Sequence, residues 1–61
     1  MSTSIVEMWK ELKILMETIE VDVIKNAQGN KSAGVRARKG LRQVKKSATD
    51  IVKSCIESDR S

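Results

Sequence analysis

Basic side chains dominate residues 29–46, GNKSAGVRARKGLRQVKK, a stretch without any acidic residue. Guanidinium groups bind phosphate in a bidentate manner, and ammonium groups act as compact point charges. Solvated helices usually mix charges of both signs to gain pairs between residues four apart, so an acid-free run favours binding to a polyanion. With one lysine added from the turns that follow, the candidate contacts are Lys31, Arg36, Arg38, Lys39, Arg42, Lys45, Lys46 and Lys53.

One of these bases stands apart from the others. On a helical wheel most of them share the flank beside the apolar stripe, but Arg36 lies near Gln43 and Asp50. Packing or a surface ion pair is therefore the alternative role for Arg36.

Charge is divided unevenly along the chain of 61 residues, whose net charge is +4. Residues 1–30 hold five acidic residues and three lysines, whereas residues 31–61 hold nine basic and three acidic residues. Such asymmetry indicates that the second half meets an anionic partner, either nucleic acid or a membrane surface.

The sequence has few residues of the types that carry out catalysis. The chain has no histidine, and its single cysteine, Cys55, falls on an apolar stripe. A nucleophile–base pair and a metal-ligand set are both lacking, so we expect no enzyme activity, no metal, no cofactor and no small-molecule substrate. One cysteine excludes an intrachain disulfide and favours a reducing cytoplasm, and no apolar run is long enough for a membrane span.

Helical periodicity organises the whole chain. Ser4 and Glu7 have the spacing of a helix N-cap, and an apolar stripe with steps of three and four residues follows. Gly29 can close that helix in the left-handed conformation, and Asn30 can cap the next. We therefore expect a single domain, 1–61, with a helix at about 4–27, a turn at about 28–30 and a helix at about 31–57.

The second helix repeats the stripe through Gly34, Ala37, Leu41, Val44, Ala48, Ile51 and Cys55. The small residues Gly34 and Ala37 stand beside the turn, which fits an antiparallel αα-hairpin. The stripe of the first helix is wider than one partner helix can cover, so the expected fold is all-α, with two hairpins forming a homodimeric four-helix bundle. A continuous coiled-coil pair or a tetramer is the alternative. The expected oligomer core is Ile5, Trp9, Leu12, Met16, Ile19, Val23, Leu41, Val44 and Ile51.

A family resemblance rests on the same basic segment. Residues 29–39, GNKSAGVRARK, resemble the G-N-K-x-A-G-x-R-A-R-K signature of the bacterial histone-like proteins typified by the chlamydial, linker-histone-like proteins that condense DNA. The resemblance implies non-enzymatic binding and organisation of double-stranded DNA in the nucleoid of a prokaryotic or phage-infected cell. Those proteins carry a long tail rich in lysine and alanine, whereas this sequence ends in CIESDRS.

Several DNA-binding modes can be separated by residue type. Stacking on single strands needs aromatic side chains, but the one aromatic residue, Trp9, belongs to the apolar stripe. No recognition-helix pattern is present, so the expected partner is double-stranded DNA contacted through phosphates, independent of sequence. The alternatives are a helical oligomerisation or adaptor module and a binder of anionic membrane surfaces.

Overall fold

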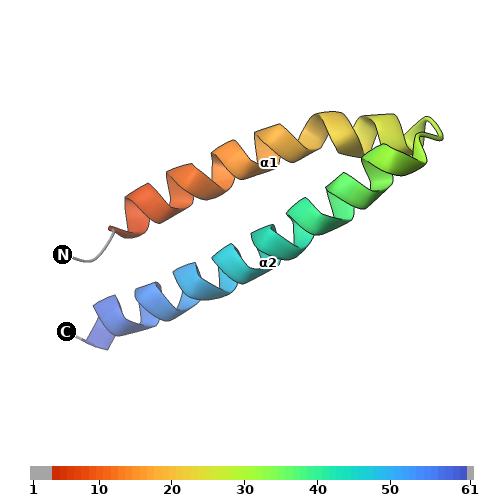
Figure 1. The fold of residues 1–61 in the computed structure, drawn as a ribbon. Helices are drawn as coiled ribbons and strands as arrows, with labels where there is room; N and C mark the ends of the chain where they lie inside the picture. The colour runs from red at the N-terminus through yellow and green to blue at the C-terminus, as the bar shows by residue number, and fades with distance from the viewer. Residues whose placement is uncertain (1–3, 61) are drawn as a thin grey trace.

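The computed structural model describes residues 4–60, which form two antiparallel helices (Figure 1). α1 spans Ile5–Ala27 and α2 spans Lys31–Arg60. The hairpin measures 48 × 16 × 14 Å. An all-α helical hairpin is thus confirmed, although α2 continues to residue 60, past its expected end near 57.

A side-chain cap starts α1. Ser4 has extended backbone angles, φ −69° and ψ 154°, and its hydroxyl accepts a hydrogen bond of 3.1 Å from the backbone N–H of Glu7. This bond satisfies one of the backbone donors left open in the first turn, and the carboxylate of Glu7 stands where it complements the helix dipole. The predicted N-cap is confirmed.

The turn closes α1 and caps α2 within three residues, 28–30. Gly29 has a φ of +102°, its N–H donates to the carbonyl of Asn26 at 2.9 Å, and the N–H of Asn30 donates to the carbonyl of Lys25 at 3.0 Å. This pair of bonds is a Schellman motif, which requires a residue that tolerates the left-handed region. The side-chain oxygen of Asn30 then accepts from the N–H of Ala33 at 3.0 Å and so caps α2.

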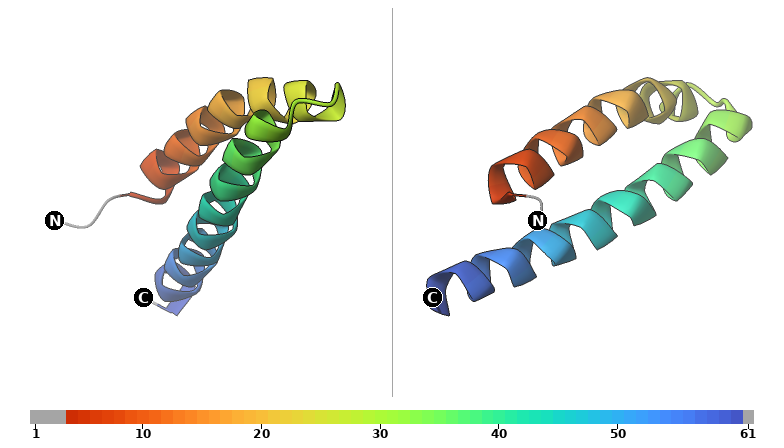
Figure 2. Two further views of the ribbon diagram at one scale, coloured as in Figure 1. Left: turned by 45° about the vertical axis from the view of Figure 1, so that its right-hand side comes forward. Right: turned by 60° about the vertical axis from the view of Figure 1, so that its left-hand side comes forward.

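The helices come closest beside the turn and diverge towards their free ends (Figures 1 and 2). Near the turn every buried residue of α2 is small; these residues are Ala33, Gly34, Ala37 and Gly40. α1 contributes Leu12 and Ile19, each 6% exposed. A Cβ atom built on Gly40 would lie 2.5 Å from Cγ1 of Ile19, so glycine at position 40 is what lets Ile19 reach the α2 backbone.

The side of α2 that faces α1 differs from the expected stripe. Beyond the small residues it continues through Val44, Ser47, Ile51 and Ser54, which are half-buried, while Leu41, Ala48 and Cys55 are exposed. Leu41, Ala48 and Cys55 therefore lie outside the contact between α1 and α2, and burial of Leu41 in an oligomer core stays a prediction. Small side chains permit a closer approach of two backbones than leucine does. The row with Gly40 and Ser47 therefore faces α1, and the row with Leu41 lies on the exposed surface next to it.

Substituting Gly40 with alanine is expected to destabilise the hairpin. The added methyl group overpacks a buried site, which costs about 1–3 kcal/mol, against about 1 kcal/mol gained in helix propensity. Gly34→Ala is the matched control, because its methyl group meets the exposed side-chain amide of Asn26, which can turn away at the loss of one exposed hydrogen bond to the carbonyl oxygen of Asn30. Thermal melts should show a lower Tm for Gly40→Ala than for Gly34→Ala. A Gly40→Ala protein at least as stable as the Gly34→Ala protein would contradict the close approach.

Candidate functional site

All eight candidate bases are exposed on α2: Lys31, Arg36, Arg38, Lys39, Arg42, Lys45, Lys46 and Lys53. α2 is one continuous helix from Lys31 to Arg60, so it sets their relative positions. The longer helix also adds Arg60, which sequence reasoning missed because the helix was expected to end earlier. Its position seven residues after Lys53 is the signal that could have revealed it.

Two rows of bases run along the outer surface of α2. Lys31, Arg38 and Lys45 form one row, and Lys39, Lys46, Lys53 and Arg60 form the other, with steps of seven residues in each. A seven-residue step returns to nearly the same side of a helix and advances about 10.5 Å. Arg42 stands between the rows, on the side opposite α1. We call these eight residues the basic face.

Acidic residues of α2 are kept off most of this surface. Asp50 and Glu57 share a line with Arg36, close to α1, and Asp59 comes only at the end of the Arg38–Lys45 row. Neighbouring cations within a row are spaced by about one Debye length at physiological salt. Asp50 and Glu57 lie three or four residues from Lys46, Lys53 and Arg60, so the part of the basic face without acidic neighbours runs from Lys31 to Lys45.

Arg36 is not part of the two rows. Its Nε lies 3.1 Å from Oδ1 of Asp22 on α1, so it makes the surface ion pair that was the alternative expectation. The pair is largely solvated and contributes little to stability, but it links the helices near the turn.

One lateral side of the hairpin is apolar. Trp9, Met16 and Val23 follow one another at seven-residue steps on α1, and Leu41, Ala48 and Cys55 do so on α2. The two lines lie on the same side, because Met16, Ile19, Glu20, Val23, Leu41 and Val44 line one open hollow of about 380 Å³. Trp9 and Leu41 are each 50% exposed. We call this surface, with its six residues Trp9, Met16, Val23, Leu41, Ala48 and Cys55, the apolar side.

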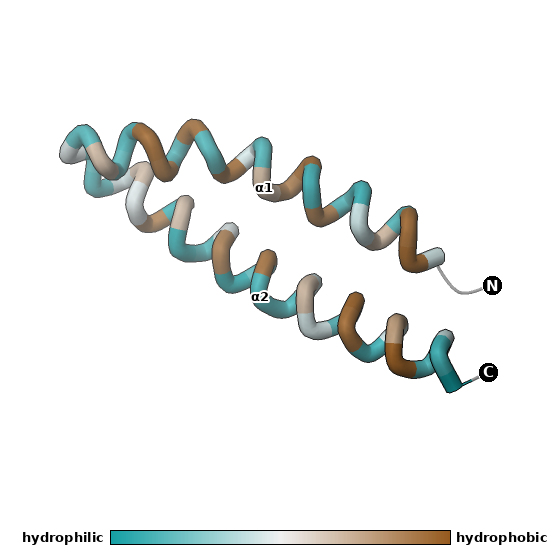
Figure 3. Tube along the Cα trace, turned by 180° about the vertical axis from the view of Figure 1, so that it is seen from behind, coloured by the Kyte–Doolittle hydropathy of each residue, from teal (hydrophilic) through white to brown (hydrophobic). Residues whose placement is uncertain are grey.

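The expected oligomer core divides between two surfaces. Leu12 and Ile19 are buried in the hairpin, and Ile5, Val44 and Ile51 are half-buried there. Trp9, Met16, Val23 and Leu41 remain exposed on the apolar side. Figure 3 shows the resulting alternation of hydrophobic and hydrophilic segments along both helices.

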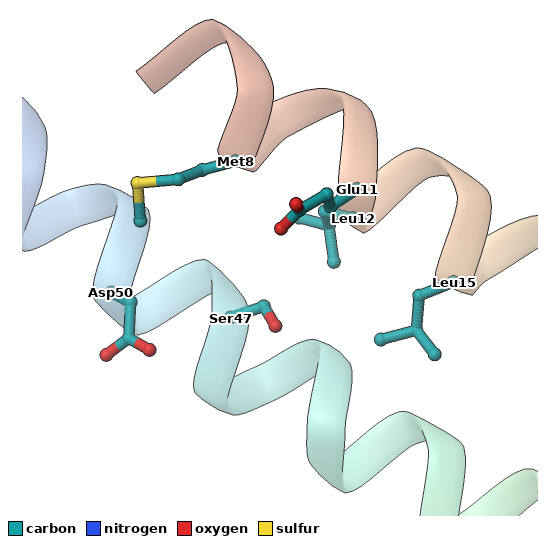
Figure 4. A pocket seen from close by; sticks show the side chains of 6 residues that line it. All are labelled: Met8, Glu11, Leu12, Leu15, Ser47 and Asp50. Atoms are coloured by element: carbon teal, nitrogen blue, oxygen red, sulfur yellow. The ribbon is translucent and has the colours of Figure 1, made fainter. Parts of the chain in front are cut away.

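The opposite lateral side is mixed in character. A hollow there of about 230 Å³ is lined by Met8, Glu11, Leu12, Leu15, Ser47 and Asp50 (Figure 4). Nearer the free ends, the hydroxyl of Ser54 donates to Sδ of Met8 at 3.5 Å. Two carboxylates therefore border the gap between the helices here, whereas the apolar side has aliphatic and aromatic groups.

The described residues offer neither a metal site nor a membrane span. Among residues 4–60, no group of three or more Cys, Asp or Glu side chains could hold a metal ion. Neither helix, over its described length, has a segment long and apolar enough to cross a membrane. The basic face and the apolar side are thus the two candidate binding surfaces among the described residues.

Comparison with known proteins gives a family that covers nearly the whole chain. Residues 6–61 match the family described as histone H1-like protein Hc1. No curated protein and no solved structure matches the chain. The matched residues include all of the basic face and all of the apolar side, and the chain belongs to the histone H1-like Hc1 family.

Proposed function

We propose that this protein binds double-stranded DNA through the basic face and organises the nucleoid without catalysing a reaction. The observation that carries the proposal is the pair of cationic rows on one continuous helix, and neither row contains an acidic residue before Asp59. Membership of a histone H1-like family supports a DNA partner.

Counterion release supplies the driving force. Duplex DNA carries one charge per about 1.7 Å of axis, and each phosphate neutralised by a protein cation releases condensed counterions. Arg38 and Arg42 can hold phosphate oxygens bidentately, while the lysines act as point charges. A rigid helix holds these cations in place before binding, which reduces the entropy lost on association.

Sequence independence is proposed from what the basic face lacks, although its arginines could also contact guanine. Bidentate reading of adenine needs Asn or Gln, and the nearest one, Gln43, lies on the line of Arg36 beside α1. Trp9, which could stack on unpaired bases, is on the apolar side. These placements favour phosphate contacts on a duplex over base contacts or single strands.

A second copy is the occupant we propose for the apolar side. A chain of 61 residues buries little apolar surface in a two-helix hairpin, and contiguous exposed apolar patches mark interaction surfaces. Pairing through this side makes a homodimeric four-helix bundle and buries Trp9, Met16, Val23 and Leu41, as the sequence predicts.

Arg42→Ala tests the phosphate contacts directly. The basic face that contacts a duplex loses one phosphate contact, so the slope of log K against log salt should become shallower by about one unit. The loss should be equal for AT-rich and GC-rich duplexes of the same length, since phosphate contacts carry no base information. Fluorescence anisotropy at several salt concentrations measures both quantities. A loss confined to one sequence would show that Arg42 reads bases.

Anionic vesicles provide the comparison arm for the same experiment. Trp9 and Leu41 next to cations could also favour a lipid surface, whereas an adaptor module would bind neither lipid nor DNA. We expect tight binding to the duplex and weak binding to vesicles at equal salt. The reverse order would assign the basic face to membranes.

A further inference from the structure

The shape of the apolar side indicates how two copies face each other. We infer that they pair with both turns at the same end, which points the two basic faces in opposite directions and lets one dimer hold two duplexes. The pairing geometry stands on the hairpin alone, and the bridging of duplexes rests on the proposed DNA binding.

The hairpin tapers, and the apolar side tapers with it. The helices are close at the turn and separate towards the free ends (Figure 1). Along the same direction α1 presents Val23, then Met16, then Trp9. The contacts of Gly40 with Ile19 and of Ser54 with Met8 fix the register, which places Gly34 near the Val23 end and Cys55 near the Trp9 end.

Same-end pairing follows the taper. It sets the partner's Trp9 over the part of the hairpin where the helices lie furthest apart, the partner's Met16 and Leu41 over the middle, and the partner's Val23 over the part nearest the turn. Reversed pairing would set the small Val23 over the part where the helices lie furthest apart and Trp9 over the part where they are closest. Interiors pack to near-crystalline density, so the arrangement that sets large side chains over widely separated helices is favoured.

The residues that border the apolar side on each helix, which we call its rims, also favour same-end pairing. On α1 the rim is Val6, Lys13, Glu20 and Ala27, and on α2 it is Lys31, Arg38, Lys45 and Val52. Same-end pairing sets the α1 rim beside the partner's α2 rim and brings Val6 to Val52, which are 60% and 57% exposed. Reversed pairing sets each rim beside the same rim of the partner copy. It leaves Val52 of one copy facing the partner's Lys31.

Charge alone does not separate the two arrangements. Same-end pairing brings Glu20 to Arg38 but Lys13 to Lys45, while reversed pairing brings Lys13 to Glu20 but Arg38 to Lys45. Each dimer therefore has two attractive and two repulsive contacts of this kind. Exposed charged pairs contribute about 0–1 kcal/mol each. The taper and the valine pair decide the orientation.

The orientation determines where the basic faces point. With both turns at one end, the two α2 helices occupy diagonal corners of the bundle, so their outer surfaces face away from each other. In the reversed bundle the two α2 helices would be neighbours and form one cationic surface on one side. Only the same-end dimer presents separate phosphate-binding faces to two duplexes.

Cross-linking with a short bis-maleimide tests the orientation without DNA. In the same-end dimer both Cys55 side chains lie at the same level, whereas reversal separates them by more than about 30 Å of helix. Wild-type protein should therefore give a covalent dimer. Met16→Cys in a Cys55→Ala background should also cross-link, because position 16 is central in either orientation, and Thr18→Cys/Cys55→Ala, on the opposite side, measures random collision.

Each outcome has a definite meaning. Cross-linking through both Cys55 and Met16→Cys, well above the Thr18→Cys level, supports the inference. Cross-linking through Met16→Cys alone would establish the reversed dimer and overturn it. No cross-linking above the collision level at either position would show that two copies do not pair through the apolar side, and would also overturn it.

Bridging is tested by retention of a fluorescent duplex on beads that carry an unlabelled duplex. Wild-type protein should retain it, and Met16→Gln/Leu41→Gln, whose changes lie outside the hairpin seam, should bind one duplex but retain at least several-fold less of the second. Circular dichroism checks that the variant stays helical. Wild-type binding to one duplex without retention of a second would overturn bridging, whereas absence of any DNA binding would count against the proposed function instead.

Discussion

Leu12→Asp is expected to unfold the hairpin. Leu12 is 6% exposed and is one of only two large side chains, with Ile19, buried between the described parts of the helices. Its replacement loses the packing of a leucine and leaves a carboxylate in an apolar contact, at a cost of at least about 3 kcal/mol. A domain of this size has only about 3–9 kcal/mol of total stability, so most of the helical signal should disappear.

Ile14→Asp is the matched control for this substitution. It makes a similar change of side chain and the same change of charge two residues further along α1, but Ile14 is 62% exposed. Surface substitutions usually change stability by about 0.5 kcal/mol or less. Circular dichroism at 222 nm should show a helical Ile14→Asp protein and a largely unfolded Leu12→Asp protein. Equal melting temperatures for the two would mean that Leu12 is not in the core.

Local chemistry explains why the helices and the turn could be predicted from the sequence. The Ser4 cap, the left-handed Gly29 and the Asn30 cap depend on residues within four positions of each other, and each residue type has few alternatives there. The ends of α1 and the start of α2 therefore agree with prediction. The far end of α2 has no stop signal of comparable strength, and the helix continues to Arg60.

The side of α2 that packs on α1 could not be read from hydrophobicity. α2 has two adjacent lines, one with Gly40 and Ser47 and one with Leu41 and Ala48, and the second is the more apolar. Close approach of the backbones selects the first line, a choice that depends on where Ile19 of α1 is placed. The ion pair of Arg36 with Asp22 likewise depends on the register between helices, which periodicity within one helix does not fix.

Replacing Lys39, Lys46 and Lys53 together by glutamine is expected to cause the largest loss of DNA binding. Glutamine has nearly the same helix propensity as lysine, and the three residues are exposed, so the fold should be kept. On each duplex-binding face about three phosphate contacts are removed, which should make the slope of log K against log salt shallower by about three units. Affinity at physiological salt should fall by about a hundredfold or more.

We expect the basic face of α2, and not net charge as such, to bind DNA. The most direct test compares the triple variant above with Lys10→Gln/Lys13→Gln/Lys25→Gln, which removes the same charge from α1. Binding of both variants and the wild type to one duplex is measured by anisotropy over a salt series. We expect the α1 variant to keep most of the wild-type affinity and slope, while the α2 variant loses both. Equal losses for the two variants, or a larger loss for the α1 variant, would contradict the account.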